Sequence, residues 1–322
     1  MSYHVLVSDN LDPLAVDELR ATPGITVEAP GKMTREQTLA AIPAAHALIV
    51  RSGTRADAEL IGAGVNLKMI VRGGVGVDNI DVAAATQRGI VVMNTPDANT
   101  IAAAEHTFAL ILALARHIPA AHASLEAGQW ERSRFMGVEL RGKTLGLIGF
   151  GRIGQAVAKR ARAFEMTVLA HDPARSRQAV AEQLGIQLVD LDELCAVADF
   201  ISLHASLNDS TRSLINRERI AMMKPGVRII NAARGPMVDA AALAEAIRTG
   251  HVAGAALDVY EQEPPAPDHP LIGLLGVVHT PHLGASTFDA QRQVGVEAAR
   301  LVIGGLIKGE YRHVVNPDVL QP

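Results

Sequence analysis

Residues 144–173 read TLGLIGFGRIGQAVAKRARAFEMTVLAHDP, and they combine a strand, a glycine-rich turn, a helix and a second strand in one run. The apolar residues Leu145–Ile148 predict a buried strand, and the one-sided apolar pattern of 155–164 predicts a helix. A second apolar run at 166–170 predicts the next strand. The turn between the first strand and the helix has the spacing G-x-G-x-x-G, formed by Gly149, Gly151 and Gly154.

This pattern is typical of a dinucleotide-binding unit. The first glycine permits a tight turn, the second lets the backbone approach a pyrophosphate, and the third lets the helix pack closely on the strand. Asp172 ends the second strand 18 positions after Gly154, where a carboxylate accepts both ribose hydroxyls and repels a 2′-phosphate. The segment predicts NAD as the cofactor, the alternative being a glycine-rich turn in another α/β unit. Arg175 and Arg177 follow closely, and because arginines can accept a 2′-phosphate they leave some use of NADP open.

The composition is that of an ordinary globular protein. The chain has 322 residues, of which 48% are hydrophobic and 20% charged, and this length favours two domains. A net charge of −4 gives no indication of a nucleic-acid partner. The single cysteine, Cys195, excludes a disulfide framework and a cysteine-rich metal site; it lies in a helical pattern and is expected in the core. Met1–Asn10 lacks the pattern of a signal peptide, and no apolar run reaches membrane-spanning length, so we expect a cytoplasmic protein without membrane contact.

Apolar runs alternate with helical patterns along the chain, which favours α/β architecture with doubly wound parallel sheets. One block of alternating strands and helices lies before residue 98 and a second block lies after residue 143, so two such domains are expected. The last long helical pattern, 286–308, lies beyond the final strand, and we expect it to cross back to the first domain. One domain is then discontinuous, 1–97 plus 287–322, and the other is 98–286. The expected strands are 4–9, 25–29, 47–52, 67–74, 90–95, 145–148, 166–170, 198–203, 226–232, 254–259 and 276–280.

A long helical pattern runs from Ala98 to about Glu126 and is apolar on more than one face. Such a helix is either buried between domains or part of a subunit interface. Together with the family resemblance described below, it favours a homodimer or a homotetramer.

Three polar residues follow apolar strands in the second half of the chain: Arg234 in NAARGPMVD, Glu263 in DVYEQEPP and His282 in TPHLGAST. In an open α/β sheet such positions lie at the mouth where a cofactor binds. A guanidinium can hold a carboxylate in two parallel hydrogen bonds, and an imidazole can exchange a proton with a carbonyl or hydroxyl oxygen. A carboxylate beside the imidazole fixes its tautomer. The set therefore indicates hydride transfer next to a substrate carboxylate.

Each of these residues has a plainer interpretation when taken alone. An arginine after a strand often forms a surface ion pair, a glutamate in a proline-rich loop is usually solvated, and most histidines are structural. The joint pattern, and the constrained position of His282 between Pro281 and the turn at 284–286, favour the catalytic interpretation.

At these positions the chain resembles the D-isomer-specific 2-hydroxyacid dehydrogenases, and within that family the phosphoglycerate-oxidising branch. The resemblance implies a Rossmann NAD-binding domain inserted in a flavodoxin-like substrate domain, and Arg234, Glu263 and His282 as the catalytic residues. The matching segments are LIVRSGT (48–54), VRGGVGVDNID (71–81), VMNTPDANTIAAAEH (92–106), WERSRFMGVELRGKTLGLIGFGRIG (130–154), NAARGPMVD (231–239), GAALDVYEQEPP (254–265) and TPHLGAST (280–287).

The resemblance also implies two sets of binding residues. The expected cofactor-binding residues are Gly149, Gly151, Arg152, Ile153, Gly154, Asp172, His204, Ala232 and Asp258. The glycine-rich segment after 71 is expected to line the substrate pocket, and arginines are expected to bind an anionic tail. The expected substrate-binding residues are Arg51, Arg72, Gly74, Val75, Gly76, Arg132 and Arg134. The last two belong either to a site in the neighbouring subunit or to a solvated loop.

The expected reaction is NAD-dependent oxidation of a D-2-hydroxy acid, foremost 3-phosphoglycerate to 3-phosphohydroxypyruvate, and its reverse. Hydroxypyruvate, glyoxylate or a sulfonated hydroxy acid such as sulfolactate are alternative substrates, and a nucleotide-sensing binding protein is a more remote alternative. Glu263 disfavours the formate dehydrogenase branch, which has glutamine at this place.

Two features depart from the pattern of the branch. Ser206 stands where the family often has proline, which leaves the shape of the loop after His204 open. The sequence also ends at residue 322 without the C-terminal regulatory domain of the long forms, so feedback by serine through such a domain is not expected.

Overall fold

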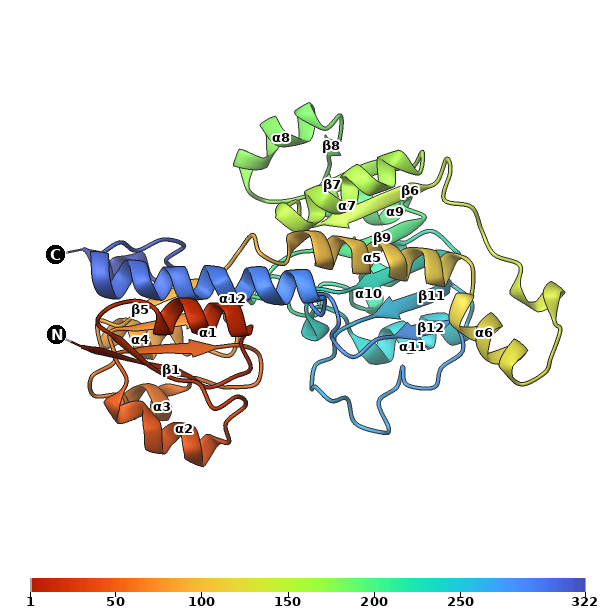
Figure 1. Cartoon of the computed structure of the whole chain (residues 1–322). Helices are drawn as coiled ribbons and strands as arrows, with labels where there is room; N and C mark the ends of the chain where they lie inside the picture. Colours follow the sequence, from red (N-terminus) through yellow and green to blue (C-terminus); the bar gives the residue numbers. More distant parts are fainter. Residues whose placement is uncertain (1, 322) are drawn as a thin grey trace. The chain divides into compact units, whose positions relative to one another are not determined.

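The computed structural model describes residues 2–321, and the side chain of Arg175 lies outside what it describes. The chain divides into two compact units (Figure 1). Unit 1 comprises the residues up to Asn99 and those from Ser286 onward, and unit 2 is Thr100–Ala285. The domain boundaries predicted from the sequence, 97/98 and 286/287, lie within two residues of those in the structure.

Unit 1 contains a parallel five-stranded sheet in the order β2-β1-β3-β4-β5. The chain passes from β1 to β2 on one side and continues from β3 on the other, so the strand order reverses between β1 and β3. The strand β3 (ALIV) is buried at all four positions, as expected for a central parallel strand. The strands are β1 (Tyr3–Val7), β2 (Ile25–Glu28), β3 (Ala47–Val50), β4 (Met69–Arg72) and β5 (Val91–Asn94).

The helices of unit 1 begin at residues that satisfy their first N–H groups. Asp12 accepts from Leu14 N ahead of α1, and Thr34 and Gln37 form a capping box at α2. Helix α12 lies beside α1 (Figure 1), where Gly295 permits the close approach to Ala15. The helices are α1 (Pro13–Arg20), α2 (Arg35–Ala41), η1 (Ile42–Ala44), α3 (Ala58–Ala63), α4 (Val82–Gln87), α12 (Phe288–Ile303), η5 (Gly304–Lys308) and η6 (Pro317–Leu320).

Unit 2 contains a parallel seven-stranded sheet in the order β12-β11-β10-β9-β6-β7-β8. Its order reverses between β6 and β9, which is where ligands bind in open α/β sheets. The prediction of two parallel α/β sheets is confirmed. The strands are β6 (Thr144–Ile148), β7 (Thr167–His171), β8 (Gln187–Leu188), β9 (Phe200–Leu203), β10 (Val227–Asn231), β11 (Val252–Leu257) and β12 (Val277–His279).

Helix α5 is apolar on two faces because it packs within unit 2 against α7 and against the strands β10, β11 and β12. Its buried side chains include Phe108, Leu110, Ile111 and Leu114. The helices of unit 2 are α5 (Thr100–Ala115), α6 (Ile118–Glu126), η2 (Arg132–Phe135), α7 (Arg152–Ala163), η3 (Arg175–Arg177), α8 (Gln178–Gln183), α9 (Leu191–Val197), α10 (Arg217–Met222), η4 (Gly235–Met237) and α11 (Ala240–Arg248).

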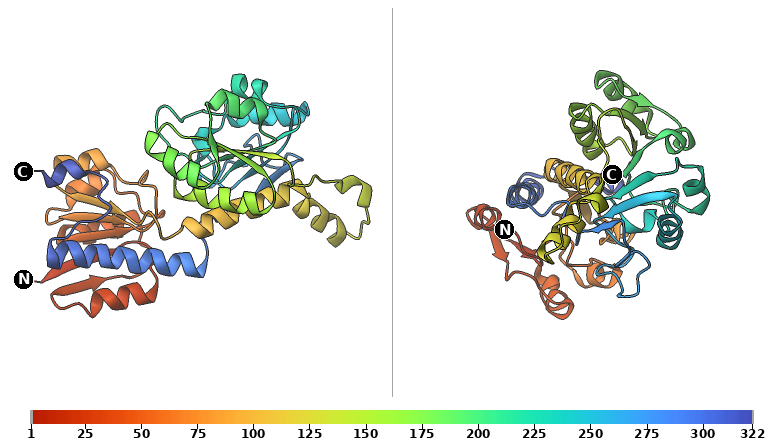
Figure 2. Two further views of the ribbon diagram at one scale, coloured as in Figure 1. Left: turned by 90° about the horizontal axis from the view of Figure 1, so that it is seen from above. Right: turned by 90° about the vertical axis from the view of Figure 1, so that its right-hand side faces the viewer.

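The helical pattern from 98 to 126 is two helices rather than one. They meet at a bend of 62°, where His117 has a left-handed φ of 53°. Pro119 lies at the start of α6, and a proline cannot continue a helix because its ring clashes with the preceding turn. Helix α6 and the segment after it project from the body of unit 2 (Figures 1 and 2).

Other differences from the sequence prediction are local. The pattern 286–308 is an α-helix followed by a π-helical turn that starts at Gly304. The short β8 and α10 were not predicted, since six residues or fewer carry little periodicity. Cys195 is buried as expected, and burial raises the pKa of its thiol to about 11.

Among residues 2–321, no single helix is long and apolar enough to cross a membrane; only the bent pair α5–α6 meets the length and composition criteria together. The same residues contain no group of three or more histidine, cysteine or acidic side chains arranged to hold a metal ion.

Candidate active site

The glycine turn of unit 2 has the geometry that its spacing predicts. Gly149 has a φ of 97°, and a Cβ atom there would lie 2.5 Å from the carbonyl carbon of His204. A side chain at Gly154 would collide with the carbonyl oxygen of Gly149. A Cβ atom at Gly151 would meet open space. Helix α7 begins directly after this residue, with Arg152 and Ile153 as its first two residues. The turn is therefore closed on the protein side and open where a pyrophosphate would approach, which fits a dinucleotide.

Asp172 joins this turn to the end of β7. Its Oδ2 accepts from Phe150 N at 2.8 Å, and its Oδ1 accepts from Ala174 N at 2.9 Å. Each carboxylate oxygen has two lone pairs, so each can still accept a ribose hydroxyl. Asp172 thus both supports the turn and has the chemistry expected for the adenosine ribose.

His204 and Ala232 lie half-buried after β9 and β10. The Nε2 atom of His204 is 2.9 Å from Ser202 Oγ, and burial lowers the pKa of His204 to about 4. Its ring is therefore neutral at physiological pH.

His282 and Glu263 form a direct pair. His282 Nδ1 is 2.6 Å from Glu263 Oε2, and because a carboxylate only accepts, Nδ1 carries the hydrogen. The other oxygen, Oε1, accepts from Tyr260 N at 3.2 Å. Burial opposes ionisation of Glu263, but the hydrogen bond from His282 and the nearby charge of Arg234 bring its pKa below the ordinary value. The side chain of His282 is 44% exposed, and Nε2 remains for a substrate.

Arg234 follows β10 in a loop that approaches the Glu263 loop. Arg234 donates from Nη1 to Ala233 O at 2.7 Å, and Asn231 Nδ2 donates to Arg234 O at 2.9 Å. Gly235 permits the approach, because a Cβ atom there would overlap the backbone of Tyr260. The three predicted catalytic residues therefore lie on neighbouring loops at one edge of the unit 2 sheet.

Asp258 is fully buried at the end of β11 and accepts hydrogen bonds from the loop that carries His282. Its Oδ1 accepts from Leu283 N at 2.7 Å and from Thr280 Oγ1 at 2.6 Å, and its Oδ2 accepts from Gly284 N at 2.9 Å. His106 on α5 also contacts Oδ1, at 3.1 Å. With these acceptor sites occupied, we expect the contribution of Asp258 to a cofactor site to be indirect.

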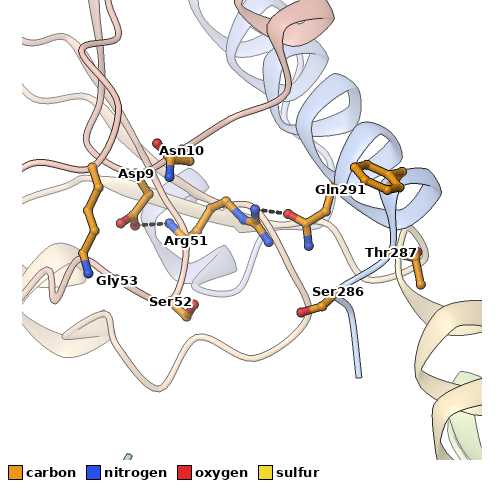
Figure 3. A pocket seen from close by; sticks show the side chains of 10 residues that line it. Asp9, Asn10, Arg51, Ser52, Gly53, Ser286, Thr287 and Gln291 are labelled. Carbon is orange, nitrogen blue, oxygen red and sulfur yellow. Dashed lines mark hydrogen bonds between the residues drawn. The ribbon is translucent and has the colours of Figure 1, made fainter. Parts of the chain in front are cut away.

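Unit 1 has a pocket of about 450 Å³ at the carboxyl ends of β1 and β3, where its strand order reverses (Figure 3). Arg51 lies in this pocket, and its Nη1 donates to Gln291 Oε1 on α12. The buried Asp9 accepts from Arg51 N at 2.6 Å and from Thr54 N at 3.1 Å, which fixes the loop after β3. The pocket is lined by Asp9, Asn10, Lys32, Arg51, Ser52, Gly53, Ser286, Thr287, Phe288 and Gln291.

The predicted glycine-rich segment follows β4 in the same unit. Gly74 has a φ of 141°, and its N–H donates to Thr95 Oγ1 at 2.7 Å, so it is used within the protein. Asn94 Nδ2 donates to Val75 O at 2.6 Å. Val75 and Gly76 remain the candidates for backbone donors to a substrate.

The predicted substrate arginines are divided between the units. Arg51 and Arg72 belong to unit 1, and Arg72 Nη1 donates to Gly73 O at 3.0 Å rather than lining the pocket of Arg51. Arg132 and Arg134 lie in η2 on the projecting segment of unit 2, and Arg134 pairs with Glu131 at 2.8 Å.

Sequence reasoning missed Asp9, Lys32, Gln291, Thr280 and His106. Asp9 was detectable, because it follows an apolar strand in the same way as Asp258. Gln291 was not, because its partner lies 240 positions away in the sequence.

The comparisons with known proteins agree with this geometry. The family model described as D-isomer specific 2-hydroxyacid dehydrogenase, NAD binding domain, matches residues 108–284, which lie within unit 2. The chain belongs to the D-isomer specific 2-hydroxyacid dehydrogenases. The predicted family and the prediction of NAD as cofactor are both confirmed.

Individual members of this family match along most of the chain. D-3-phosphoglycerate dehydrogenase of Archaeoglobus fulgidus is 52% identical over 99% of this chain and 60% of its own length. Hydroxypyruvate reductase of Thermotoga maritima is 49% identical over 92% of this chain and 95% of its own length. D-lactate dehydrogenase of Aquifex aeolicus, solved with NAD and lactic acid, has a TM-score of 0.85 at 29% identity, covering 97% of this chain and 99% of that one. The chain thus spans about 60% of the length of the phosphoglycerate dehydrogenase and nearly all of the hydroxypyruvate reductase.

Proposed function

We propose that the protein is an NAD-dependent dehydrogenase that oxidises a D-2-hydroxy acid to the 2-keto acid, and that 3-phosphoglycerate is its substrate. The hydrogen bond of 2.6 Å between His282 and Glu263, beside Arg234, carries the reaction class. The relatives named phosphoglycerate dehydrogenase support the substrate. A reaction of this kind would belong to serine biosynthesis in the cytoplasm.

In the proposed oxidation, a cofactor held by the glycine turn and Asp172 would supply the hydride acceptor for the carbon that bears the substrate hydroxyl. His282 Nε2 takes the hydroxyl proton, and Glu263 stabilises the resulting imidazolium through Nδ1. Arg234 holds the substrate carboxylate in two parallel hydrogen bonds. In reduction the protonated His282 returns the proton to the carbonyl oxygen.

The proposed cofactor site is the glycine turn of unit 2. The backbone around Gly149–Gly154 and the N-terminus of α7 hold the pyrophosphate, and Asp172 accepts the ribose hydroxyls. His204, Ala232 and the loop supported by Asp258 complete the site. Because the carboxylate of Asp172 repels a 2′-phosphate, NAD is preferred to NADP.

The pocket around Arg51 is suited to bind an anionic group at the far end of the substrate. Arg51 and Lys32 both line it, and Ser286 and Thr287, which directly precede α12, contribute hydroxyl groups. Burial lowers the pKa of Arg51 while Asp9 acts in the opposite direction, and an arginine remains charged at neutral pH. A planar guanidinium suits a phosphate.

Hydroxypyruvate reduction is the second candidate. It is favoured by the hydroxypyruvate reductase of Thermotoga maritima, which is 49% identical over 92% of this chain. The reaction centre would be the same, and only the use of the anion pocket would differ.

A substrate panel separates these proposals. Purified protein is assayed with 3-phosphoglycerate, glycerate, lactate and sulfolactate, with NAD and with NADP, and with hydroxypyruvate and glyoxylate in the reductive direction. We expect the highest kcat/KM for 3-phosphoglycerate with NAD. Equal values for glycerate and 3-phosphoglycerate would refute the phosphate assignment, and absence of turnover with all six would refute the enzyme assignment and favour a binding protein that senses NAD.

The proposed assembly is a homodimer formed through the segment that projects from unit 2. Large apolar side chains are exposed there, with Trp130 and Met136 each 78% exposed. An exposed apolar patch of this kind usually marks a surface that a partner covers. Arg132 or Arg134 would then belong to the neighbouring subunit's substrate site. Light scattering after chromatography should show a dimer that Trp130→Glu converts to a monomer; an unchanged mass would contradict this interface.

A further inference from the structure

Helix α5 contributes one side chain to the strand ends that carry the proposed catalytic histidine. His106 Nε2 lies 3.1 Å from Asp258 Oδ1 and 3.1 Å from Thr280 Oγ1. Since a carboxylate only accepts, Nε2 carries the hydrogen and donates it to this cluster. The side chain is 19% exposed, so the contact is largely shielded from water.

Asp258 connects this contact to the loop of His282. Its carboxylate accepts the backbone N–H groups of Leu283 and Gly284, and its carbonyl oxygen accepts His282 N at 2.8 Å. Burial opposes the ionised form of Asp258, but the hydrogen bonds from His106, Thr280 and Leu283 bring its pKa below the ordinary value. The carboxylate therefore holds Leu283 and Gly284, and the carbonyl oxygen of the same residue holds His282, so that three consecutive loop residues are fixed to the end of β11.

The loop needs such support because His282 has a left-handed backbone, with a φ of 55°. A residue with a side chain adopts this conformation rarely, and it persists where surrounding contacts impose it. Among the donors to Asp258, Thr280, Leu283 and Gly284 belong to the β12 end and the loop itself and would move with it. His106 is the one donor in this cluster that comes from a separate element, and α5 is fixed by its buried face.

We propose that His106 is a positioning residue for the reaction: it orients the Asp258 carboxylate, which holds the His282 loop so that His282 meets both Glu263 and the substrate. This inference rests on the proposed function of His282. The effect is on the geometry of proton transfer and not on binding of the substrate anion.

The test compares His106→Ala and His106→Gln in the full chain, with NAD and the substrate that the wild-type protein turns over. The alanine variant should lose about 10–100-fold in kcat, with KM nearly unchanged, because misplacement of a catalytic group costs this much. Its pH–rate midpoint should move lower, since a looser pair with Glu263 favours the charged imidazole less. The glutamine variant should recover most of kcat and the wild-type midpoint, because its amide can donate in place of Nε2.

A matched control is His251→Ala, which removes another half-buried histidine of unit 2 whose Nε2 is 2.9 Å from Ile220 O. It should leave the midpoint unchanged. Hydrogen exchange of the amides at 282–284 gives a second measurement that does not depend on turnover: exchange should become faster in His106→Ala and stay at the wild-type rate in His106→Gln. Unchanged exchange and an unchanged midpoint in His106→Ala would overturn the inference, whereas an inactive wild-type protein with faster exchange in the variant would overturn only the proposed function.

Discussion

Asp9 in unit 1 and Asp258 in unit 2 occupy similar places in two different sheets. Each follows a buried parallel strand, and each carboxylate accepts backbone N–H groups from a loop at the end of the neighbouring strand. The loop held by Asp9 carries Arg51, and the loop held by Asp258 carries His282. The same local device therefore positions a permanent cation in one unit and a titratable base in the other.

The difference lies in what surrounds each loop. Arg51 lies in a pocket with a second cation and is bonded to Gln291, an arrangement suited to holding an anion. His282 is paired with Glu263 and lies beside Arg234, an arrangement suited to moving a proton. Changes in the loop of Arg51 should therefore act on KM, and changes in the loop of His282 should act on kcat.

The largest expected effect is that of His282→Gln. It should reduce kcat by about 10²–10⁴-fold, because it removes the group that exchanges the proton with the substrate oxygen. Binding of NADH, measured by fluorescence titration, should stay near the wild-type value, and so should kcat in His251→Gln. A variant with near-normal kcat would remove His282 from the mechanism and with it the contrast between the two loops.

Arg51→Gln should act on binding instead. Loss of a charge-assisted contact to the substrate tail is worth about 1.5–3 kcal/mol, which raises KM for 3-phosphoglycerate by about 10–100-fold. The KM for glycerate, which has no phosphate, should change little. Arg35→Gln is the control, since Arg35 pairs with Asp57 and Glu59 on the surface of the same unit. Equal increases of KM for glycerate and 3-phosphoglycerate would show that Arg51 does not contact the phosphate.

The residues in and around these two loops also differ in how well the sequence alone predicts them. Parallel strands were predictable because their apolar runs are continuous, and the positions of Arg234, Glu263 and His282 beyond strand ends were predictable because each follows such a run. The glycine turn was predictable because Gly149 and Gly154 leave no room for a side chain. These inferences depend on neighbours in sequence.

Contacts between distant segments were not predictable. Arg51 with Gln291 and His106 with Asp258 are separated by 240 and 152 positions, and nothing in the local pattern of either residue indicates its partner. The break between α5 and α6 lies next to Pro119, but the apolar residues on both sides of it continue the helical pattern, so one helix was expected there. The side chains that hold these loops in place can thus be identified only from the three-dimensional structure.

Gly53→Ala should perturb the Arg51 loop without removing any charge. A Cβ atom at Gly53 would collide with Asp9 Oδ1, so either the carboxylate or the loop has to move. We expect a loss of about 1–3 kcal/mol in the free energy of unfolding and a several-fold rise in KM for the phosphorylated substrate. Gly62→Ala is the matched control, because a Cβ atom there meets nothing within 4 Å and the same substitution in helix α3 should stabilise by about 0.4–1 kcal/mol. If the two variants behaved alike in thermal unfolding and in KM, Asp9 would not be what fixes Arg51.

The smallest expected effect is a loss of stability in acid that is due to His204. Burial lowers the pKa of His204 to about 4, whereas an unfolded histidine titrates near ~6.5. Because the unfolded chain binds the proton first, stability is complete above pH ~6.5 and falls as the pH drops toward 4; by pH ~5.5 the loss is about 1 kcal/mol.

Asp258 and Glu263, whose pKa values are lowered, lose their stabilising contribution only as the pH falls through the ordinary carboxyl pKa and below it, so they contribute little between pH 7.5 and 5.5. His279 in unit 2 and His46 in unit 1, whose pKa values burial also lowers, do contribute, so His204→Gln should reduce the slope of stability against pH without abolishing it. Hydrogen exchange at pH 7.5 and 5.5, compared between His204→Gln and the wild type, would locate the loss that is due to His204 in peptides from β6 and β9. If the slope in those unit 2 peptides were the same in His204→Gln as in the wild type, another group would be responsible for it, and the neutral imidazole beside the glycine turn would have no influence on stability.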